Sequence, residues 1–335
     1  MLNNSLYLHP QNIRMKKEST PEKSGLHLRN NYKNQYDFKQ LAQSNPDVAK
    51  FVFTNEYQIE SIDFSVPEAV KALNKAILIA DFDIQNWDIP TNYLCPPIPG
   101  RTDYLHYIAD LLSHDNNDII PIGENTIGLD IGVGANCIYP ILGHKIYGWQ
   151  FVGTDTDEVA IENCEKIIAS NPELIDFVSL QLQVEPRFIF KNIILPEDKF
   201  AFTICNPPFH SSPDEASKAA IRKVNALQNI RTTNPILNFG GQNSELWTAG
   251  GELGFVTQMI FESKKYPLQV MWFTTLVSKK ENLSSLQKTL IKVEAVKIET
   301  INMAQGHKTS RILAWTFLTE KQRIDWKFES VEIKF

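Results

Sequence analysis

Short apolar runs alternate with amphipathic stretches from about residue 126 onward, and this alternation limits the folds open to the chain. Five of these runs have the length and composition of buried strands, at residues 126–131, 151–154, 177–182, 200–205 and 271–278. Strands that alternate with helices pair in parallel through right-handed crossovers. With two closing strands expected at 295–303 and 311–318, the pattern predicts a doubly wound, seven-stranded α/β sheet.

The residues before this alternation divide into a basic arm and a helical region. The first 35 residues are polar and basic and show no periodicity, which predicts a flexible arm. After Pro67, apolar residues recur on one helical face, and a second helix is expected after Arg101. We therefore expect an arm at 1–35, a helical region at 36–100, a main domain at 101–320 with a long insertion at 209–250, and a tail at 321–335.

The net charge is informative only when it is divided along the chain. The total of −6 consists of +4 over residues 1–40 and −10 over the remainder. We therefore expect contacts with nucleic-acid phosphate groups at the basic N-terminal segment and not over the acidic remainder of the chain.

The four cysteines and the N-terminus bear on the cellular location. The cysteines are widely spaced and form no Cys-x-x-Cys pair, which argues against a disulfide framework and against a metal site. The N-terminus lacks the apolar run of a signal peptide, and no apolar stretch is long enough to span a bilayer. We expect a monomeric cytoplasmic protein without membrane association.

A glycine turn follows the first predicted strand of the main domain. Asp130 stands near the end of that strand, and Gly132 and Gly134 form a Gly-x-Gly turn that brings bare backbone against a ligand. Cys137 occupies the position of the third glycine of a dinucleotide fingerprint. The acid therefore suits a ligand with an ammonium group, such as S-adenosylmethionine. The alternative is a tight turn without a ligand.

Asp155 ends the next predicted strand. A carboxylate at this position can accept two hydrogen bonds from a ribose diol. The alternative is that Asp155 caps the following helix, but Asp157 is better placed for capping.

The sequence Cys205-Asn206-Pro207-Pro208-Phe209 ends the fourth predicted strand. The two prolines fix the backbone and lack N–H donors, so the Asn206 side-chain oxygen and a neighbouring carbonyl can both accept from one amino group. Two such acceptors stabilise the positive charge that develops when a methyl group reaches that nitrogen. Phe209 offers a face on which a flipped-out base can stack. The alternative is a proline-rich turn with a buried phenylalanine.

These two motifs together resemble those of class I S-adenosylmethionine-dependent amino-group methyltransferases, which have a Rossmann-like sheet. Further blocks narrow the resemblance to the bacterial 23S ribosomal RNA methyltransferases that act on N6 of adenine 1618, and a eukaryotic relative acts on U6 small nuclear RNA. The blocks lie at residues 25–30, 70–76, 86–90, 95–101, 130–140, 238–242, 269–278 and 303–306.

The resemblance implies a cofactor, a catalytic motif and an RNA substrate. The catalytic residues would be Asn206, Pro207, Pro208 and Phe209, which hold the adenine for direct displacement. S-adenosylmethionine would be held by Arg101, Asp130, Gly132, Gly134, Asn136, Asp155 and Asn206. The role of Arg101, as the partner of the methionine carboxylate, comes from the resemblance alone. No metal is implied.

Basic residues in three segments are candidates for contacts with 23S rRNA or its precursor, as is the helical region at 36–100. They are His27 and Arg29 in the arm, Lys218, Arg222 and Lys223 in the insertion, and Arg311 near the closing strands. The alternatives are a disordered tail for the arm and a solvated helix face for the insertion.

Two other functions are compatible with the same motifs. Protein-glutamine N5-methyltransferases carry Asn-Pro-Pro-Tyr, and Phe209 and the basic arm disfavour that activity. A non-catalytic RNA-binding assembly factor could use the same fold, and the intact motifs at Gly132–Gly134 and Asn206–Phe209 disfavour it.

Overall fold

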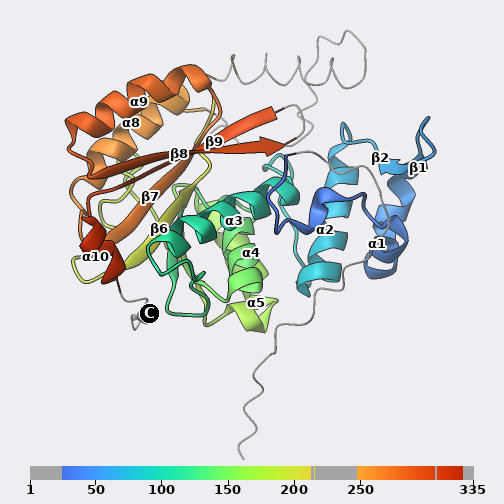
Figure 1. Ribbon diagram of the computed structural model, residues 1–335. Helices are drawn as coiled ribbons and strands as arrows, with labels where there is room; N and C mark the ends of the chain where they lie inside the picture. The colour runs from blue at the N-terminus through green and yellow to red at the C-terminus, as the bar shows by residue number, and fades with distance from the viewer. Residues whose placement is uncertain (1–24, 213–214, 216–246, 306–307, 327–335) are drawn as a thin grey trace, which may run out of the picture.

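The computed structural model describes residues 25–212, 215, 247–305 and 308–326. A seven-stranded sheet forms its centre (Figure 1), in the order β5-β4-β3-β6-β7-β9-β8. Neighbouring strands from β5 to β7 are parallel, and β9 runs antiparallel to both β7 and β8. The predicted doubly wound sheet is confirmed.

The strands lie within two or three residues of their predicted positions. Their bounds are β3 Ile127–Ile131, β4 Gln150–Asp155, β5 Val178–Leu182, β6 Phe200–Cys205, β7 Val270–Val277, β8 Lys297–Gln305 and β9 Lys308–Thr316. The central strands β3, β6 and β7 are buried along their whole length, as expected for parallel strands covered on both faces.

Helices cover both faces of the sheet (Figure 1). One face carries α3 (Ile98–His114), α4 (Ile138–Tyr147) and α5 (Glu158–Ala169), and the other carries α8 (Gly251–Ser263) and α9 (Lys280–Lys292). Each face has its own hydrophobic cluster. A short helix, α10 (Glu320–Ile324), follows the last strand.

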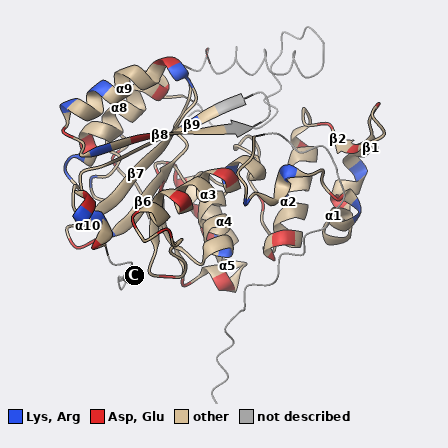
Figure 2. Ribbon diagram, in the orientation of Figure 1, with Lys and Arg blue, Asp and Glu red and all other residues tan. Residues whose placement is uncertain are grey.

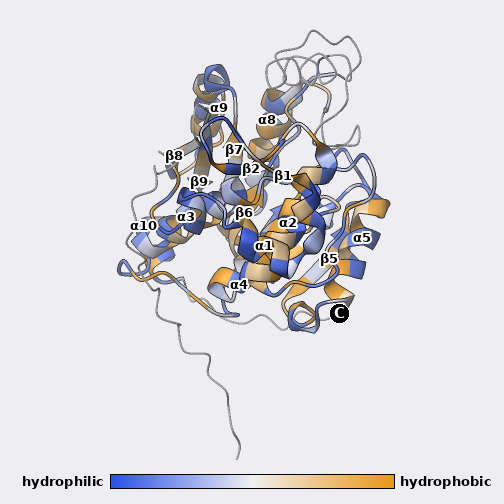
Figure 3. Ribbon diagram, turned by 90° about the vertical axis from the view of Figure 1, so that its right-hand side faces the viewer, coloured by the Kyte–Doolittle hydropathy of each residue, from blue (hydrophilic) through white to orange (hydrophobic). Residues whose placement is uncertain are grey.

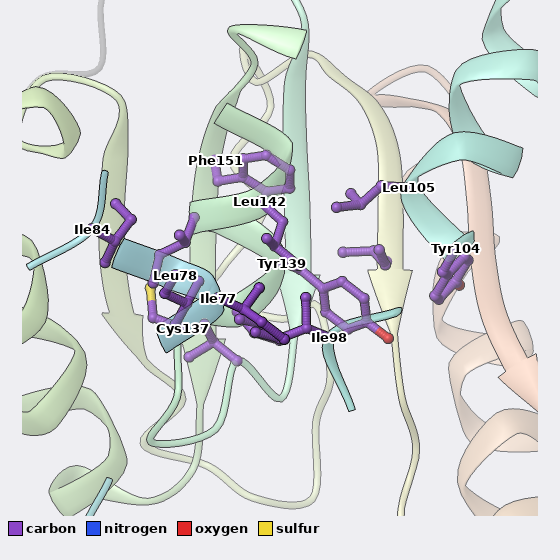
Figure 4. Packing of buried hydrophobic residues seen from close by; sticks show 14 of the residues in the cluster. Ile77, Leu78, Ile84, Ile98, Tyr104, Leu105, Cys137, Tyr139, Leu142 and Phe151 are labelled. Atoms are coloured by element: carbon purple, nitrogen blue, oxygen red, sulfur yellow. The ribbon is translucent and has the colours of Figure 1, made fainter. Parts of the chain in front are cut away.

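The N-terminal region is mainly helical, as predicted. It contains α1 (Phe38–Ser44), α2 (Pro67–Phe82) and a small hairpin of β1 (Val52–Thr54) and β2 (Glu60–Ile62). Seen from the side in Figure 3, α1 and α2 stand in front of the sheet. Ile77 and Leu78 of α2 belong to the same hydrophobic cluster as residues of α3 and α4 (Figure 4), so this region shares a core with the main domain.

The segment before α1 differs from its prediction. Residues 25–35 are not a flexible arm, because Leu26, His27, Asn30 and Tyr32 are buried. Asn30 donates to the Pro99 carbonyl (2.8 Å) and to the Asp103 carboxylate, both in α3. The polar groups that hold this segment lie from 49 to 118 residues away in the sequence. The local sequence therefore shows only polar residues, which indicated solvent exposure. Residues 1–24 lie outside the described part of the chain.

The start of α3 also differs from its prediction. The helix begins at Ile98, so Arg101 lies in its first turn instead of before it. Pro99 in this first turn is compatible with a helix because the N–H groups there have no partner within the helix.

Charged residues of both signs are distributed over the described helices (Figure 2). The basic residues of the predicted insertion, Lys218, Arg222 and Lys223, lie outside the described residues, as does most of that insertion. In the part of the chain that the structure describes, no helix is long and apolar enough to cross a lipid bilayer.

Candidate active site

A cavity of about 270 Å³ lies at the carboxyl edge of the sheet, where β3, β4 and β6 end. Most of the residues predicted for the site line it, namely Arg101, Gly132, Gly134, Asn136, Asp155, Asn206, Pro207 and Pro208. They come from four segments spread over about 100 residues of the chain, and the parallel strand order brings the strand ends among them to one edge of the sheet. Asp130 and Phe209 are the two predicted residues that do not line the cavity.

The glycine turn after β3 is fixed against the end of β4. Gly132 and Gly134 have φ angles of 75° and 61°, which other residues adopt at a cost. The N–H groups of Gly132 and Val133 donate to the Thr154 carbonyl, each at 2.9 Å. The N–H of Gly134 donates to a carboxylate oxygen of Asp155, also at 2.9 Å.

Asp157, and not Asp155, is the N-cap residue of α5, as the sequence indicated. Asp157 caps α5 by accepting from the Val159 N–H at 3.0 Å. The oxygens of Asp155 accept from Gly134 N–H (2.9 Å) and Asp157 N–H (3.0 Å). A carboxylate oxygen can accept more than one hydrogen bond, so the side chain keeps acceptor capacity toward the cavity. Burial is the main cause that raises its pKa above the usual carboxyl range.

Asp130 is buried without a hydrogen-bond partner. Its side chain is fully buried, and within the described residues neither carboxylate oxygen has a partner. Burial raises its pKa well above the usual range, the negative charge of Asp155 raises it further, and the positive charge of Arg101 lowers it. A buried acid of this kind is stabilised by a cation that enters beside it.

Arg101 supplies the opposite charge. One of its terminal nitrogens, Nη1, donates to the Tyr139 hydroxyl at 2.8 Å, and the guanidinium lies 5.3 Å from the centre of that ring. Its Nε is buried and has no partner within the described residues. Arg101 lines the cavity, and Asp130 is buried next to Ile131 and Gly132, which line it too. A cation at the cavity surface and an acid just beneath it fit a ligand with both a carboxylate and an ammonium group.

The motif after β6 forms another wall of the cavity. Pro207 is buried, whereas Asn206 and Pro208 are partly exposed and line the cavity. The Phe209 ring is partly buried, and His210 then forms a parallel bridge with Trp247. The Thr248 N–H donates to the His210 carbonyl at 3.0 Å, which ties the end of the motif to the start of α8.

Several lining residues were not predicted from the sequence. Gln183 directly follows β5, as Asp155 ends β4, so the rule that ligands bind at strand ends could have found it. Tyr139, Phe188, Phe255 and Gln258 lie on helices or an irregular loop, and only the tertiary arrangement brings them to the cavity. No local pattern distinguishes them from ordinary packing residues.

The RNA-contact candidates of the arm, buried His27 and exposed Arg29, both bind other groups of the protein. His27 is 7% exposed, and its Nε2 lies 2.8 Å from the Asp110 carboxylate. Arg29 forms an ion pair with Asp110 at 2.7 Å and donates to the His106 carbonyl (2.7 Å) and to the Tyr147 hydroxyl (3.2 Å). Both side chains hold the segment of residues 25–35 on α3. Arg311 is partly buried in β9, opposite Val277 of β7.

Residues 20–319 match the model of a protein family described as RNA methyltransferase. Two similar proteins are named ribosomal RNA large subunit methyltransferase F. The one from Flavobacterium psychrophilum is 68% identical over 94% of this chain and 100% of its own. The one from Photobacterium profundum is 48% identical over 94% of this chain and 98% of its own.

Solved structures of human METTL16 share the fold. Its catalytic domain in complex with MAT2A 3′UTR hairpin 1 superposes with a TM-score of 0.72 at 30% identity, covering 88% of this chain and 96% of that chain. Its N-terminal domain in complex with SAH superposes with a TM-score of 0.69 at 30% identity, covering 88% of this chain and 99% of that chain.

Proposed function

The chain belongs to this RNA methyltransferase family, and from that premise we propose that it transfers a methyl group from S-adenosylmethionine to N6 of adenine 1618 in 23S rRNA. The relatives named ribosomal RNA large subunit methyltransferase F support an RNA of the large ribosomal subunit as substrate. One observation carries the proposal, namely that Asn206, Pro207 and Pro208 share a cavity with the glycine turn and Asp155. A methyl acceptor and a nucleoside-type donor can therefore meet in that cavity.

The residues at one end of the cavity fit S-adenosylmethionine. Arg101, whose Nε has no partner within the described residues, suits its carboxylate, and the remaining acceptor capacity of Asp155 suits its ribose hydroxyls. Asp130 does not line the cavity, and its carboxylate would attract the ammonium group from just behind Ile131 and Gly132, which do. The glycine turn lets the backbone approach the ligand closely. When bound, this cofactor supplies an electrophilic methyl group on a sulfonium centre.

The residues at the other end would hold the adenine amino group. The exocyclic nitrogen of adenine is a poor nucleophile because its lone pair is delocalised into the ring. The Asn206 side-chain oxygen and a neighbouring carbonyl, fixed by Pro207 and Pro208, would accept its two hydrogens and favour a pyramidal nitrogen. The amine loses its proton after the attack, so positioning and electrostatics are sufficient and a strong base is not required.

The base would be flipped out of the RNA and stacked on Phe209. Lys218, Arg222, Lys223, Arg311 and the helical region at 36–100 would contact RNA phosphates. His27 and Arg29 would support these contacts indirectly, by holding the N-terminal segment in place. We propose that the protein acts as a monomer in the cytoplasm.

Transfer of labelled methyl groups to purified large-subunit particles and to deproteinised 23S rRNA tests the proposal. The RNA is digested to nucleosides, and the labelled product is identified by mass spectrometry. We expect N6-methyladenosine as the labelled nucleoside. Label on a peptide glutamine, or on no component although S-adenosylmethionine is bound, would contradict the assignment.

A further inference from the structure

Helix α8 carries two buried glutamates, one near each end, and neither contacts the cavity directly. Glu252 is 1% exposed and Glu262 is 6% exposed. Buried carboxylates are unfavourable unless several donors satisfy them. The donors that each one recruits show what each glutamate holds in place.

Glu262 binds the loop that follows β5. Its two oxygens accept from three consecutive backbone N–H groups, those of Ile189 (2.8 Å), Phe190 (3.0 Å) and Lys191 (2.7 Å). Three successive N–H groups that converge on one carboxylate fix the backbone of the loop at that point. Phe188 and Ile189 line the cavity, so this contact sets the position of that wall.

A second contact from α8 reaches the same loop. Gln258 lies one turn before Glu262, and its side-chain amide donates to the Arg187 carbonyl. Gln258 and Phe255 of this helix also line the cavity. Helix α8 therefore contributes to the wall and also holds the neighbouring loop against it.

Glu252 binds a different part of the site. It accepts from Ser278 N–H (2.7 Å), Lys279 N–H (3.2 Å) and the Asn282 side-chain amide (2.7 Å), where β7 ends and α9 begins. Strand β7 is the neighbour of β6, which carries the Asn206 motif. A Cβ atom at Gly251, the preceding residue, would lie 3.2 Å from the Ser211 nitrogen, so this end of α8 backs directly onto the segment after Phe209.

We propose that α8 positions both sides of the site. Glu262 fixes the loop after β5 on the cofactor side of the cavity, and Glu252 fixes the junction of β7 and α9 on the acceptor side. This inference rests on the proposed function, because it assigns the two sides to methyl donor and methyl acceptor. Both glutamates are positioning residues that act through the backbone they bind. Their separation by about three turns of helix allows one side of the site to be disturbed without the other.

Matched variants Glu262→Gln and Glu252→Gln test this division. Glutamine keeps the size of the side chain but places an NH₂ group against backbone N–H donors, which removes part of the acceptor set. We expect Glu262→Gln to raise the Kd for S-adenosylmethionine at least tenfold, with kcat at saturating cofactor within about twofold of the parent. We expect Glu252→Gln to leave that Kd within about twofold and to lower kcat at least tenfold.

Amide hydrogen exchange of the cofactor-free variants provides a readout that does not depend on activity. The N–H groups of Ile189, Phe190 and Lys191 should exchange faster in Glu262→Gln alone, and those of Ser278 and Lys279 faster in Glu252→Gln alone. Glu262→Asp, which keeps the charge, should recover part of the cofactor affinity. All measurements are made at a temperature at which both variants are folded. The local changes in exchange and in cofactor affinity are then separated from a general loss of stability.

Two outcomes would overturn the proposal. One is equal loss of cofactor affinity in both variants, and the other is accelerated exchange over the whole chain in either variant at matched global stability. If the parent protein transfers no methyl group but the two variants still show the separate exchange pattern, the proposed function fails and the mechanical role of α8 stands.

Discussion

The two ends of the cavity are built in different ways. At the end that fits the cofactor, backbone N–H groups from two loops are bonded to fixed acceptors, the Thr154 carbonyl, Asp155 and Glu262. At the end proposed for the methyl acceptor, Pro207 and Pro208 restrict the backbone of the motif, and the chain beyond them leads into the predicted insertion. The cofactor is the same small molecule in every turnover and suits a preformed site, whereas a base that enters from RNA requires an approach path. The two ends should therefore respond separately to mutation.

The largest separation is expected for Asn206→Ala. Removal of the amide oxygen deletes one of the two acceptors for the amino group, so we expect kcat to fall at least about 100- to 1,000-fold. The Kd for S-adenosylmethionine should change less than about threefold, because Asn206 is only one of the residues expected to hold the cofactor, and Arg101, Asp155 and the glycine turn remain. Single-turnover methyl transfer and calorimetry measure these two quantities.

Asn116→Ala is a matched control for this variant. Asn116 lies just beyond the far end of α3 and donates to the Ile119 carbonyl, away from the cavity. It should leave both quantities unchanged. Wild-type turnover by Asn206→Ala would remove Asn206 from the acceptor site.

Arg101→Gln should weaken cofactor binding and leave turnover nearly unchanged, which is the reverse of Asn206→Ala, and the change should be smaller. Hydrogen bonds to charged groups contribute about 1.5–3 kcal/mol, so loss of the guanidinium should raise the cofactor Kd about 10- to 100-fold. Turnover at saturating cofactor should remain within about threefold of the parent. A change in kcat with an unchanged Kd would place Arg101 at the acceptor end instead.

Asp130→Asn should produce opposite effects on stability and binding. Burial raises the pKa of Asp130, so the folded protein binds this proton more tightly than the unfolded chain does. The stability contributed by the protonated group is present below the unfolded pKa of about 3.9 and is lost as the pH rises through the raised value. At neutral pH the variant should therefore unfold a few degrees higher than the parent when no cofactor is present.

The same substitution should weaken cofactor binding about tenfold, because it removes the buried anion that attracts the ammonium group from behind the cavity wall. In the parent, cofactor affinity should rise with pH through the raised pKa of Asp130. Asp155 raises this pKa further and Arg101 opposes the rise. Thermal unfolding and calorimetry from about pH 5 to pH 8 measure both effects, and a less stable variant at neutral pH would contradict the assignment.

The smallest effect is expected from deletion of residues 1–24. These residues carry a net charge of +2, so RNA affinity should fall a few-fold and depend less steeply on salt, with an unchanged cofactor Kd. Deletion of residues 1–35 should instead destabilise the protein, since it removes the buried Asn30 and Tyr32. Equal RNA affinity at all salt concentrations after the shorter deletion would show that the N-terminal charge is incidental.

The sequence was sufficient to predict the parts of the molecule in which local pattern and tertiary structure agree. The apolar runs predicted the strands. The positions of Asp155 and Asn206 at strand ends predicted that both lie at the cavity, because parallel strands bring these ends together. The docked segment at 25–35 was predicted wrongly because its partners Asp103 and Asp110 lie far along the chain. Phe188 and Glu262 were missed for the same reason, since their roles depend on how α8 and a loop meet.

The most direct test of the central claim is the mapping of N6-methyladenine in 23S rRNA from cells that lack this gene. Complementation with the parent gene and with the Asn206→Ala variant provides the comparison, and mass spectrometry of RNA fragments locates the modification. We predict that one N6-methyladenine, at position 1618, is absent without the gene, returns with the parent and does not return with the variant. An unchanged set of N6-methyladenines in the three strains would contradict the account.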